Sequence, residues 1–370
     1  MKALLFCLLL LIAPAAVAAP PAGCESEGGL AARNDIVLCE SWESTTWYLT
    51  AGRYYQDGEK TSPTAADATD VANTSIIKSG CISGKCLKVR CRAANDADAA
   101  NRGCTGMLSI WVAIPGTLQE AYFRYYIRTS ANWDPTNYDN CAPPCTPTSS
   151  DNGGKWPGFG DVRTNADPST QCGNGGDYSD GINCWSGRLK YRNCLGSGDA
   201  DICSAEGGGS EKTRLGWYWY VPPANGANNQ MFAAFDNQSW GTGPDPGAVQ
   251  GDGSCGAGPL NTGSTGSDST SCGKGAAGLK NGKWYLVEGY VKMNTAGTAD
   301  GIARAWINGT LKYEKTNMKY RESGHDNLHV RGFWLDVHMG GEFVGPRRES
   351  YIVIDQLVIA TGARVQGWSQ

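Results

Sequence analysis

The sequence of 370 residues predicts an all-β fold of two packed antiparallel sheets, and three observations support this. No stretch longer than a few residues keeps the period of an amphipathic helix. Alternating β-branched and aromatic residues recur between clusters of Gly, Asn, Asp and Pro, as in antiparallel strands joined by turns. The 50 Gly, 13 Trp and 16 Tyr, with only 18% charged residues, exclude a coiled coil or a disordered charged tail and favour a large core.

Ten runs show the clearest strand alternation. They are residues 35–39, 86–91, 108–114, 121–129, 185–192, 215–221, 284–294, 302–307, 330–339 and 351–360. Asn308-Gly309 follows one of these runs and predicts a tight hairpin, because both residues tolerate positive φ. Two long inserts, 131–183 and 222–281, interrupt strands of the same character, so we expect one domain over 19–370 in which the inserts wall a cleft.

The N-terminus predicts export. Lys2 precedes the apolar run 3–13 and then Ala16-Val17-Ala18, the small-x-small pattern of a signal-peptidase site, so we expect residues 1–18 to be a signal peptide. The run is shorter than the roughly 20 apolar residues of a membrane span. We therefore expect a protein that is secreted, extracellular or periplasmic, with no membrane association.

The cysteine content agrees with an oxidising compartment. Of 15 cysteines, Cys7 lies in the expected signal peptide, which leaves 15 − 1 = 14, an even number that allows seven disulfides. Zinc is the competing interpretation, but the chain has no C-x-x-C pair. The short spacings Cys81 to Cys86 and Cys141 to Cys145 favour stapled turns, so we expect long loops held by disulfides.

Two strands gather cations on one face, and in the first of them that face is also aromatic, because side chains alternate along a strand. These faces contain Tyr122, Arg124, Tyr126 and Arg128 in one strand, and Ser186, Arg188, Lys190 and Arg192 in the other. Either strand alone also fits a solvated edge, where Lys and Arg discourage aggregation. The formal net charge of −4 argues against a nucleic-acid partner, so these basic faces are local features of an acidic chain.

A third strand and a glycine-rich segment strengthen the interpretation as a binding face. Tyr218 and Tyr220 share one face of the run 215–221, and Gly-Gly-Lys-Trp-Pro-Gly at 153–158 predicts a turn that holds Lys155 near a sheet. Arg binds carboxylates through a fork of donors, and aromatic rings lie against sugars. Together these residues predict a partner that is a carboxylate-bearing polysaccharide.

The same segments resemble polysaccharide lyase family 14 and related jelly-roll lyases. The resemblance is carried, in order, by G-G-K-W-P-G at 153–158, W-S-G-R-L at 185–189, Y-W-Y at 218–220, G-K-W at 282–284 running into V-K-M-N-T at 291–295, and M-G-G at 339–341. It implies a β-jelly roll whose concave face cleaves acidic polysaccharides such as alginate or glucuronan. The expected activity is that of a lyase acting by β-elimination.

By position, the resemblance implies that the functional residues are Lys155, Ser186, Arg188, Tyr218 and Tyr220. Cations such as Lys155 and Arg188 neutralise the uronate carboxylate and the charge that develops as the C5 proton leaves. A tyrosine beside them should have its phenolate favoured, so we interpret Tyr220 as the base and Tyr218 as its partner or the acid. Which tyrosine is the base stays open, and Ser186 is expected to orient substrate.

Further residues are expected to bind substrate. They are Arg124, Tyr126, Lys190, Glu288, Lys292 and His338, which lie on same-face rows of expected strands. Asp355, in an apolar strand, fits either a calcium ligand or an acceptor for backbone groups. His325-Asp-Asn-Leu-His329 has the spacing of a zinc protease helix but lacks its Glu, so we expect no metal in the site and no cofactor.

Two other functions compete with the lyase. A non-catalytic carbohydrate-binding jelly roll would keep Trp and Tyr platforms, but would not need Lys155, Arg188 and the Tyr pair together. A glycoside hydrolase needs two carboxylates about 5 to 10 Å apart, and no E-x-D-x-x-E strand is present. We expect a monomer, and the sequence leaves open which uronate polymer is cleaved and whether cleavage is endo or exo.

Overall fold

The structure, a computed structural model, describes a subset of the chain. The described residues are 30, 33–49, 54–56, 71–92, 108–133, 153–162, 179, 181–193, 212–222, 230–234, 278–339 and 349–365. Within them lie sixteen strands and one turn of 3-10 helix, η2 (Trp47–Leu49). The expected signal peptide and most of both inserts fall outside this set. No helix in the described part is long and apolar enough to cross a membrane.

One sheet, called the β6 sheet, contains eight strands. In spatial order they are β14 (Thr310–Met318), β13 (Gly301–Ile307), β12 (Trp284–Lys292), β6 (Glu120–Thr129), β16 (Ser350–Ala360), β4 (Cys86–Cys91) and β3 (Thr74–Ile77), and β1 (Ile36–Glu40) also pairs with β16. All of these pairings are antiparallel.

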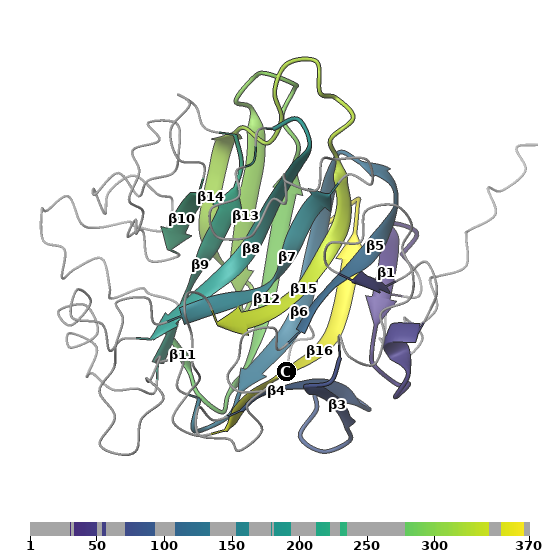
Figure 1. Ribbon diagram of the computed structural model, residues 1–370, viewed down its shortest axis with the longest axis vertical. Helices are drawn as coiled ribbons and strands as arrows, with labels where there is room; N and C mark the ends of the chain where they lie inside the picture. The colour runs from purple at the N-terminus through teal and green to yellow at the C-terminus, as the bar shows by residue number, and fades with distance from the viewer. Residues whose placement is uncertain are drawn as a thin grey trace, which may run out of the picture.

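The second sheet, called the β8 sheet, packs face to face against the first (Figure 1). In spatial order its strands are β10 (Gln230–Ala234), β9 (Lys212–Tyr220), β8 (Cys184–Asn193), β7 (Gly153–Val162), β15 (Val330–Met339), β5 (Leu108–Leu118) and β2 (Tyr54–Gln56), and β11 (Gly278–Lys280) also pairs with β9. The expected all-β jelly roll of two antiparallel sheets is confirmed, and all ten expected runs are strands.

The core lies between the sheets and is aromatic. Phe123 of β6 lies with its ring centroid 5.0 Å from that of Phe159 and 5.1 Å from that of Phe333, both in the β8 sheet. Burying each such ring stabilises the fold by roughly 1.5–3 kcal/mol. Gly187 of β8 lets Trp219 pack directly on the backbone, because a Cβ at residue 187 would lie 2.0 Å from that indole.

The segment 153–158 is a strand and not the expected turn. It forms the first part of β7, whose register with β8 shifts between Trp156 and Gly158. Pro157 sits at this irregularity because proline has no N–H to donate to the ladder. The Gly and Pro content that suggested a turn therefore marks a bulge within a strand. The hairpin at Asn308-Gly309 is confirmed, with φ values of 48° and 79°.

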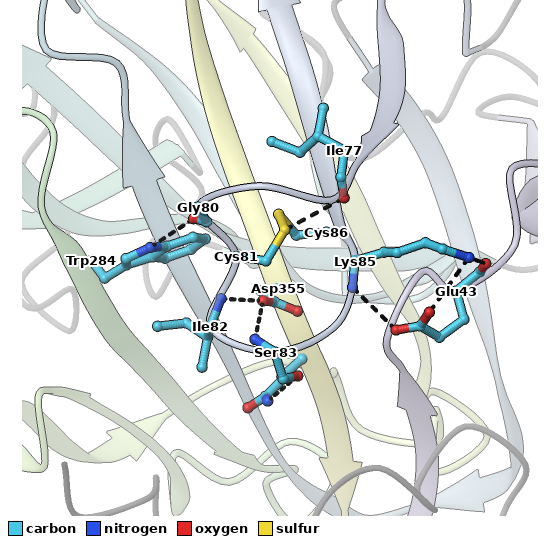
Figure 2. The surroundings of a disulfide bond; sticks show 11 residues. Glu43, Ile77, Gly80, Cys81, Ile82, Ser83, Lys85, Cys86, Trp284 and Asp355 are labelled. Carbon is cyan, nitrogen blue, oxygen red and sulfur yellow. Dashed lines mark hydrogen bonds and ion pairs between the residues drawn. A yellow bond between two sulfur atoms is a disulfide. The ribbon is translucent and has the colours of Figure 1, made fainter.

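A disulfide joins Cys81 to Cys86 across the loop that precedes β4, as the spacing predicted (Figure 2). Cys39, Cys91 and Cys184 are also disulfide-bonded. The Asp355 carboxylate accepts the backbone N–H groups of Ile82 and Ser83 at 2.8 and 3.2 Å. Of the two roles left open for Asp355, the structure thus shows the backbone acceptor.

Candidate active site

Three adjacent strands bring the residues of the motifs onto one face. Lys155 lies in β7, Ser186 and Arg188 in β8, and Tyr218 and Tyr220 in β9. The register pairs Ser186 with Tyr220 and Arg188 with Tyr218, and directly paired residues of an antiparallel sheet point to the same side.

The residues between them point into the core, so this face is the outward face of the β8 sheet. The alternate residues Trp156, Trp185, Leu189, Trp217 and Trp219 all belong to the hydrophobic core. The period of two read from the sequence therefore holds through β7, β8 and β9 up to the shift in register at Pro157.

Lys155 lies against both tyrosines. Its Nζ is 3.4 Å from Tyr220 Oη, to which it donates, and it lies 5.2 and 5.4 Å from the ring centroids of Tyr218 and Tyr220. The two rings meet edge to face with centroids 5.0 Å apart. An ammonium beside aromatic faces and a phenol oxygen stabilises negative charge that develops on that oxygen.

Arg188 is fully buried and forms an ion pair with Asp336 of β15. Its guanidinium also lies 3.8 Å from the ring centroid of Trp334 and 5.4 Å from that of Tyr220. A buried charge must be compensated, and Asp336, itself 1% exposed, supplies the opposite charge. Arg188 therefore lies in the site as half of a neutral pair.

Trp334 is held in turn by β5. Its ring stacks on Trp111 with centroids 4.7 Å apart, and its indole N–H donates to Ser109 Oγ at 3.0 Å. Arg188 is thus packed on a ring whose orientation is fixed by a neighbouring strand.

The surroundings of Tyr220 act against ionisation of its phenol. Burial raises the pKa of Tyr220 well above its ordinary value, and the charge and hydrogen bond of Tyr218 raise it further. Arg188 lowers this pKa, but Asp336 partly cancels that effect. Arg188 thus favours the Tyr220 phenolate as expected, but burial outweighs its effect and the net shift of the Tyr220 pKa is upward.

Ser186 is fully buried, and its Oγ has no hydrogen-bond partner among the described residues. A buried hydroxyl without a partner costs about 1–3 kcal/mol. This cost would be removed by a partner that arrives with a ligand.

Four expected binding residues lie elsewhere. Arg124 and Tyr126 are in β6 and Glu288 and Lys292 are in β12, so they belong to the β6 sheet. The sequence alternation in β6 resembles that of β8, but the outward faces of two packed sheets point in opposite directions. These four residues therefore do not share a face with Lys155. The Glu288 carboxylate binds Arg364, at 2.8 and 2.6 Å.

Lys190 and His338 are placed by their backbones alone. Lys190 of β8 and His338 of β15 are the register partners of Lys155 on its two sides. Their side chains lie outside the described residues.

Sequence reasoning did not assign roles to Asp336, Trp334 or Trp111. Asp336 was visible only as a polar residue alternating with apolar ones, and its partner Arg188 is 148 residues away. A buried carboxylate between apolar neighbours is the one signal that could have suggested an ion pair.

The zinc-protease spacing does not form a helix. The residues from His325 to His329 form turns, and the His329 N–H donates to Asp161 at 2.7 Å. Among the described residues, one group, Cys81, Cys86 and Asp355, has metal-ligand atoms close together. The two sulfurs there are bonded to each other, so they are not available as thiolate ligands.

Comparison with known proteins identifies the family resemblance. The family model "Polysaccharide lyase 14" matches residues 255–346, a range that includes β12 to β15. No curated protein matches the chain. The expected resemblance and the expected enzyme class, a polysaccharide lyase, are confirmed by this match.

Solved structures of similar fold include a marine alginate lyase of family 14 from Aplysia kurodai, at 14% identity and TM-score 0.51, with 88% of this chain and 99% of that chain covered. Alginate lyase vAL-1 from Chlorella virus has 14% identity and TM-score 0.44, with coverages of 80% and 95%. An endo-β-1,4-glucuronan lyase from Trichoderma reesei has 14% identity and TM-score 0.42, with coverages of 78% and 86%. At these identities the Aplysia structure supports the fold.

Proposed function

We propose that the chain is a secreted polysaccharide lyase that cleaves a uronic-acid polymer, of the alginate or glucuronan type, by β-elimination. The observation that carries the proposal is the grouping of Lys155, Arg188, Tyr218 and Tyr220 on one face of β7, β8 and β9. The N-terminal pattern at residues 1–18 supports secretion.

The reaction requires three things of the site. A base removes the proton at C5 of the uronate, the C4–O bond breaks as the C4=C5 double bond forms, and the departing oxygen takes up a proton. Negative charge builds up on the carboxylate side of C5, so a positioned cation lowers the barrier. At about 4 Å and an effective dielectric near 20, one cation supplies roughly 4 kcal/mol, about three powers of ten in rate.

We assign this charge to Lys155. Its ammonium is partly exposed on the site face, whereas the charge of Arg188 is already balanced by Asp336. Arg188 then acts chiefly by packing against Tyr220 and Trp334, which fixes the phenol beside Lys155.

We assign the acid role to Tyr220 and the base role to Tyr218. The raised pKa keeps the proton on Tyr220, as a general acid requires before it protonates the departing oxygen. Tyr218 is less buried than Tyr220, and its hydrogen bond with Tyr220 is of the kind that holds the proton on Tyr220. This order reverses the roles expected from the sequence.

The test follows ultraviolet absorbance of unsaturated uronate ends while the full chain acts on alginate, glucuronan and other acidic polymers. We expect a rise with one of them that falls by about three powers of ten in Lys155→Ala. Lys312→Ala, at a partly exposed lysine of β14 in the other sheet, is the matched control and should keep the rate. Binding without any rise would refute the lyase and support the non-catalytic carbohydrate-binding protein.

A further inference from the structure

Cations and aromatic rings also gather on the outward face of the β6 sheet, on the opposite side of the molecule from Lys155. Lys88, Val353, Arg128 and Trp284 are successive register partners across β4, β16, β6 and β12. At about 4.8 Å between strands, this row is roughly 14 Å long.

Beside this row, Arg90 pairs with Tyr351 in the same register. We call Lys88, Arg90, Arg128, Trp284 and Tyr351 the β4 patch. All five side chains are partly exposed, while Val353 is buried beneath the row.

Two of the three cations of the β4 patch lie over rings. Lys88 Nζ lies 4.2 Å from the centroid of the Tyr351 ring, and the Arg128 guanidinium lies 5.0 Å from that of Trp284. In the part of the chain that the structure describes, no carboxylate forms an ion pair with Lys88, Arg90 or Arg128. A ring face attracts the charge but accepts no conventional hydrogen bond, so N–H donors remain for a carboxylate from outside.

Two other cations on the same outward face do form ion pairs with carboxylates. Arg304 pairs with Glu314 at 2.6 Å, and Arg364 pairs with Glu288 at 2.6 Å. With 36 Asp and Glu against 32 Lys and Arg in the chain, acidic partners are plentiful. Among the described residues, the three cations of the β4 patch therefore differ from Arg304 and Arg364 in having no carboxylate partner.

The disulfide loop fixes one end of this patch. The Trp284 indole N–H donates to the Gly80 carbonyl at 3.2 Å, next to Cys81 of the disulfide (Figure 2). Gly80 has φ of +72°, and a Cβ there would lie 3.0 Å from Arg128 Nη2. A glycine at this position thus leaves room for the guanidinium, and the rings and cations are held in place before any ligand arrives.

We propose that the β4 patch is a second binding site for an acidic polysaccharide, distinct from the catalytic face. Unpaired Lys and Arg donors fit the carboxylates of a uronate chain, and the rings beside them fit sugar faces. The identity of this ligand rests on the proposed function. Because the patch and Lys155 lie on opposite outward faces, the patch would anchor the enzyme to polymer without occupying the catalytic site.

The test compares Lys88→Gln/Arg90→Gln with a charge-matched control, Lys312→Gln/Lys319→Gln. The two control lysines are partly exposed and lie in β14 and directly after it, at the other end of the β6 sheet. Binding to polymeric alginate and glucuronan is measured by affinity electrophoresis at two salt concentrations, and elimination is measured on short oligouronates. Melting temperatures verify that both variants are folded.

We expect the β4-patch variant to bind the polymer about fivefold more weakly, with a smaller salt dependence and an unchanged rate on oligouronates. Equal polymer binding by both variants would overturn the proposal while leaving the lyase intact. If the β4-patch variant binds polymer more weakly but the unmodified chain has no lyase activity, the second binding site is supported and the proposed function is overturned. An equal loss of binding to inorganic polyphosphate, which has neither sugar rings nor carboxylates, would show an unselective anion site. This result, or an absence of binding to any polyuronate, would also overturn the proposal.

Discussion

The two outward faces of this sandwich carry the same residue types in different surroundings. On the β8 sheet, Arg188 is fully buried and paired with Asp336, whereas on the β6 sheet Arg128 is partly exposed and lies against a ring. A buried ion pair positions its neighbours, because moving either charge would leave the other uncompensated. A partly exposed cation over a ring keeps donors for ligands. The comparison teaches that one residue type is fixed in a buried ion pair beside the tyrosines of the β8 sheet and left with free donors over a ring in the β4 patch.

The largest expected effect is on the rate of elimination, and it comes from the two tyrosines of the β8 sheet. Tyr220→Phe should lower elimination by about three powers of ten, because the acid is lost, while the fold is kept. Tyr218→Phe should lower it as much. In D2O, Tyr220→Phe should still exchange the C5 proton of an oligouronate, which nuclear magnetic resonance detects. Exchange kept in Tyr218→Phe and lost in Tyr220→Phe would return the base role to Tyr220.

The next effect tests the buried pair. Arg188→Met should lower the free energy of unfolding by about 3 kcal/mol, because the Asp336 carboxylate stays buried without its guanidinium. Arg188→Met/Asp336→Leu should recover most of that loss but not the activity. Urea unfolding measures both. A double variant no more stable than the single one would show that Asp336 is compensated by other groups.

A smaller effect concerns the disulfide beside the β4 patch. Cys81→Ser/Cys86→Ser should lower the free energy of unfolding by about 2 kcal/mol, as expected for so short a loop. The rate on short oligouronates should be unchanged, and polymer binding should weaken because Trp284 loses a fixed carbonyl partner. Loss of oligouronate turnover in a folded variant would mean that the two faces are coupled.

The smallest expected effect is on stability, and it comes from a partly exposed ion pair that belongs to neither face. Arg33 lowers the pKa of the Asp35 carboxyl below 3.8 through a hydrogen bond and its charge. The pair therefore stabilises the fold above that pH, and the contribution is lost as pH falls through the lowered pKa. Asp35→Asn should cost about 0.5 kcal/mol near neutral pH and nothing in strong acid. A constant difference across this pH range in urea unfolding would contradict it.

Much of the fold could be predicted because alternation is a local property. The expected run 185–192 is β8 in the structure, with Trp185 and Leu189 in the core and Arg188 outward. β7 was missed because Gly and Pro are the ordinary signs of a turn, and nothing local distinguishes a bulged strand from one.

The site could be predicted less completely. Short motifs placed Lys155, Arg188 and Tyr220 together, and the structure brings Lys155 and Arg188 each against Tyr220. Period-two patterns cannot tell which sheet a strand joins, so Arg124 of β6 was grouped with a face it does not share. The shift in the pKa of Tyr220 depends on burial and on Asp336, which only the assembled sheet supplies.

The position of β16 has a consequence for when this protein can fold. Residues 350–360 form a strand between β6 and β4 and also pair with β1, although all three precede it by more than 200 residues. The β6 sheet cannot close until that late segment has been synthesised, and such distant pairings form slowly. Until then β6 and β4 lack the strand that lies between them, so we expect the β6 sheet to form after synthesis and not during it.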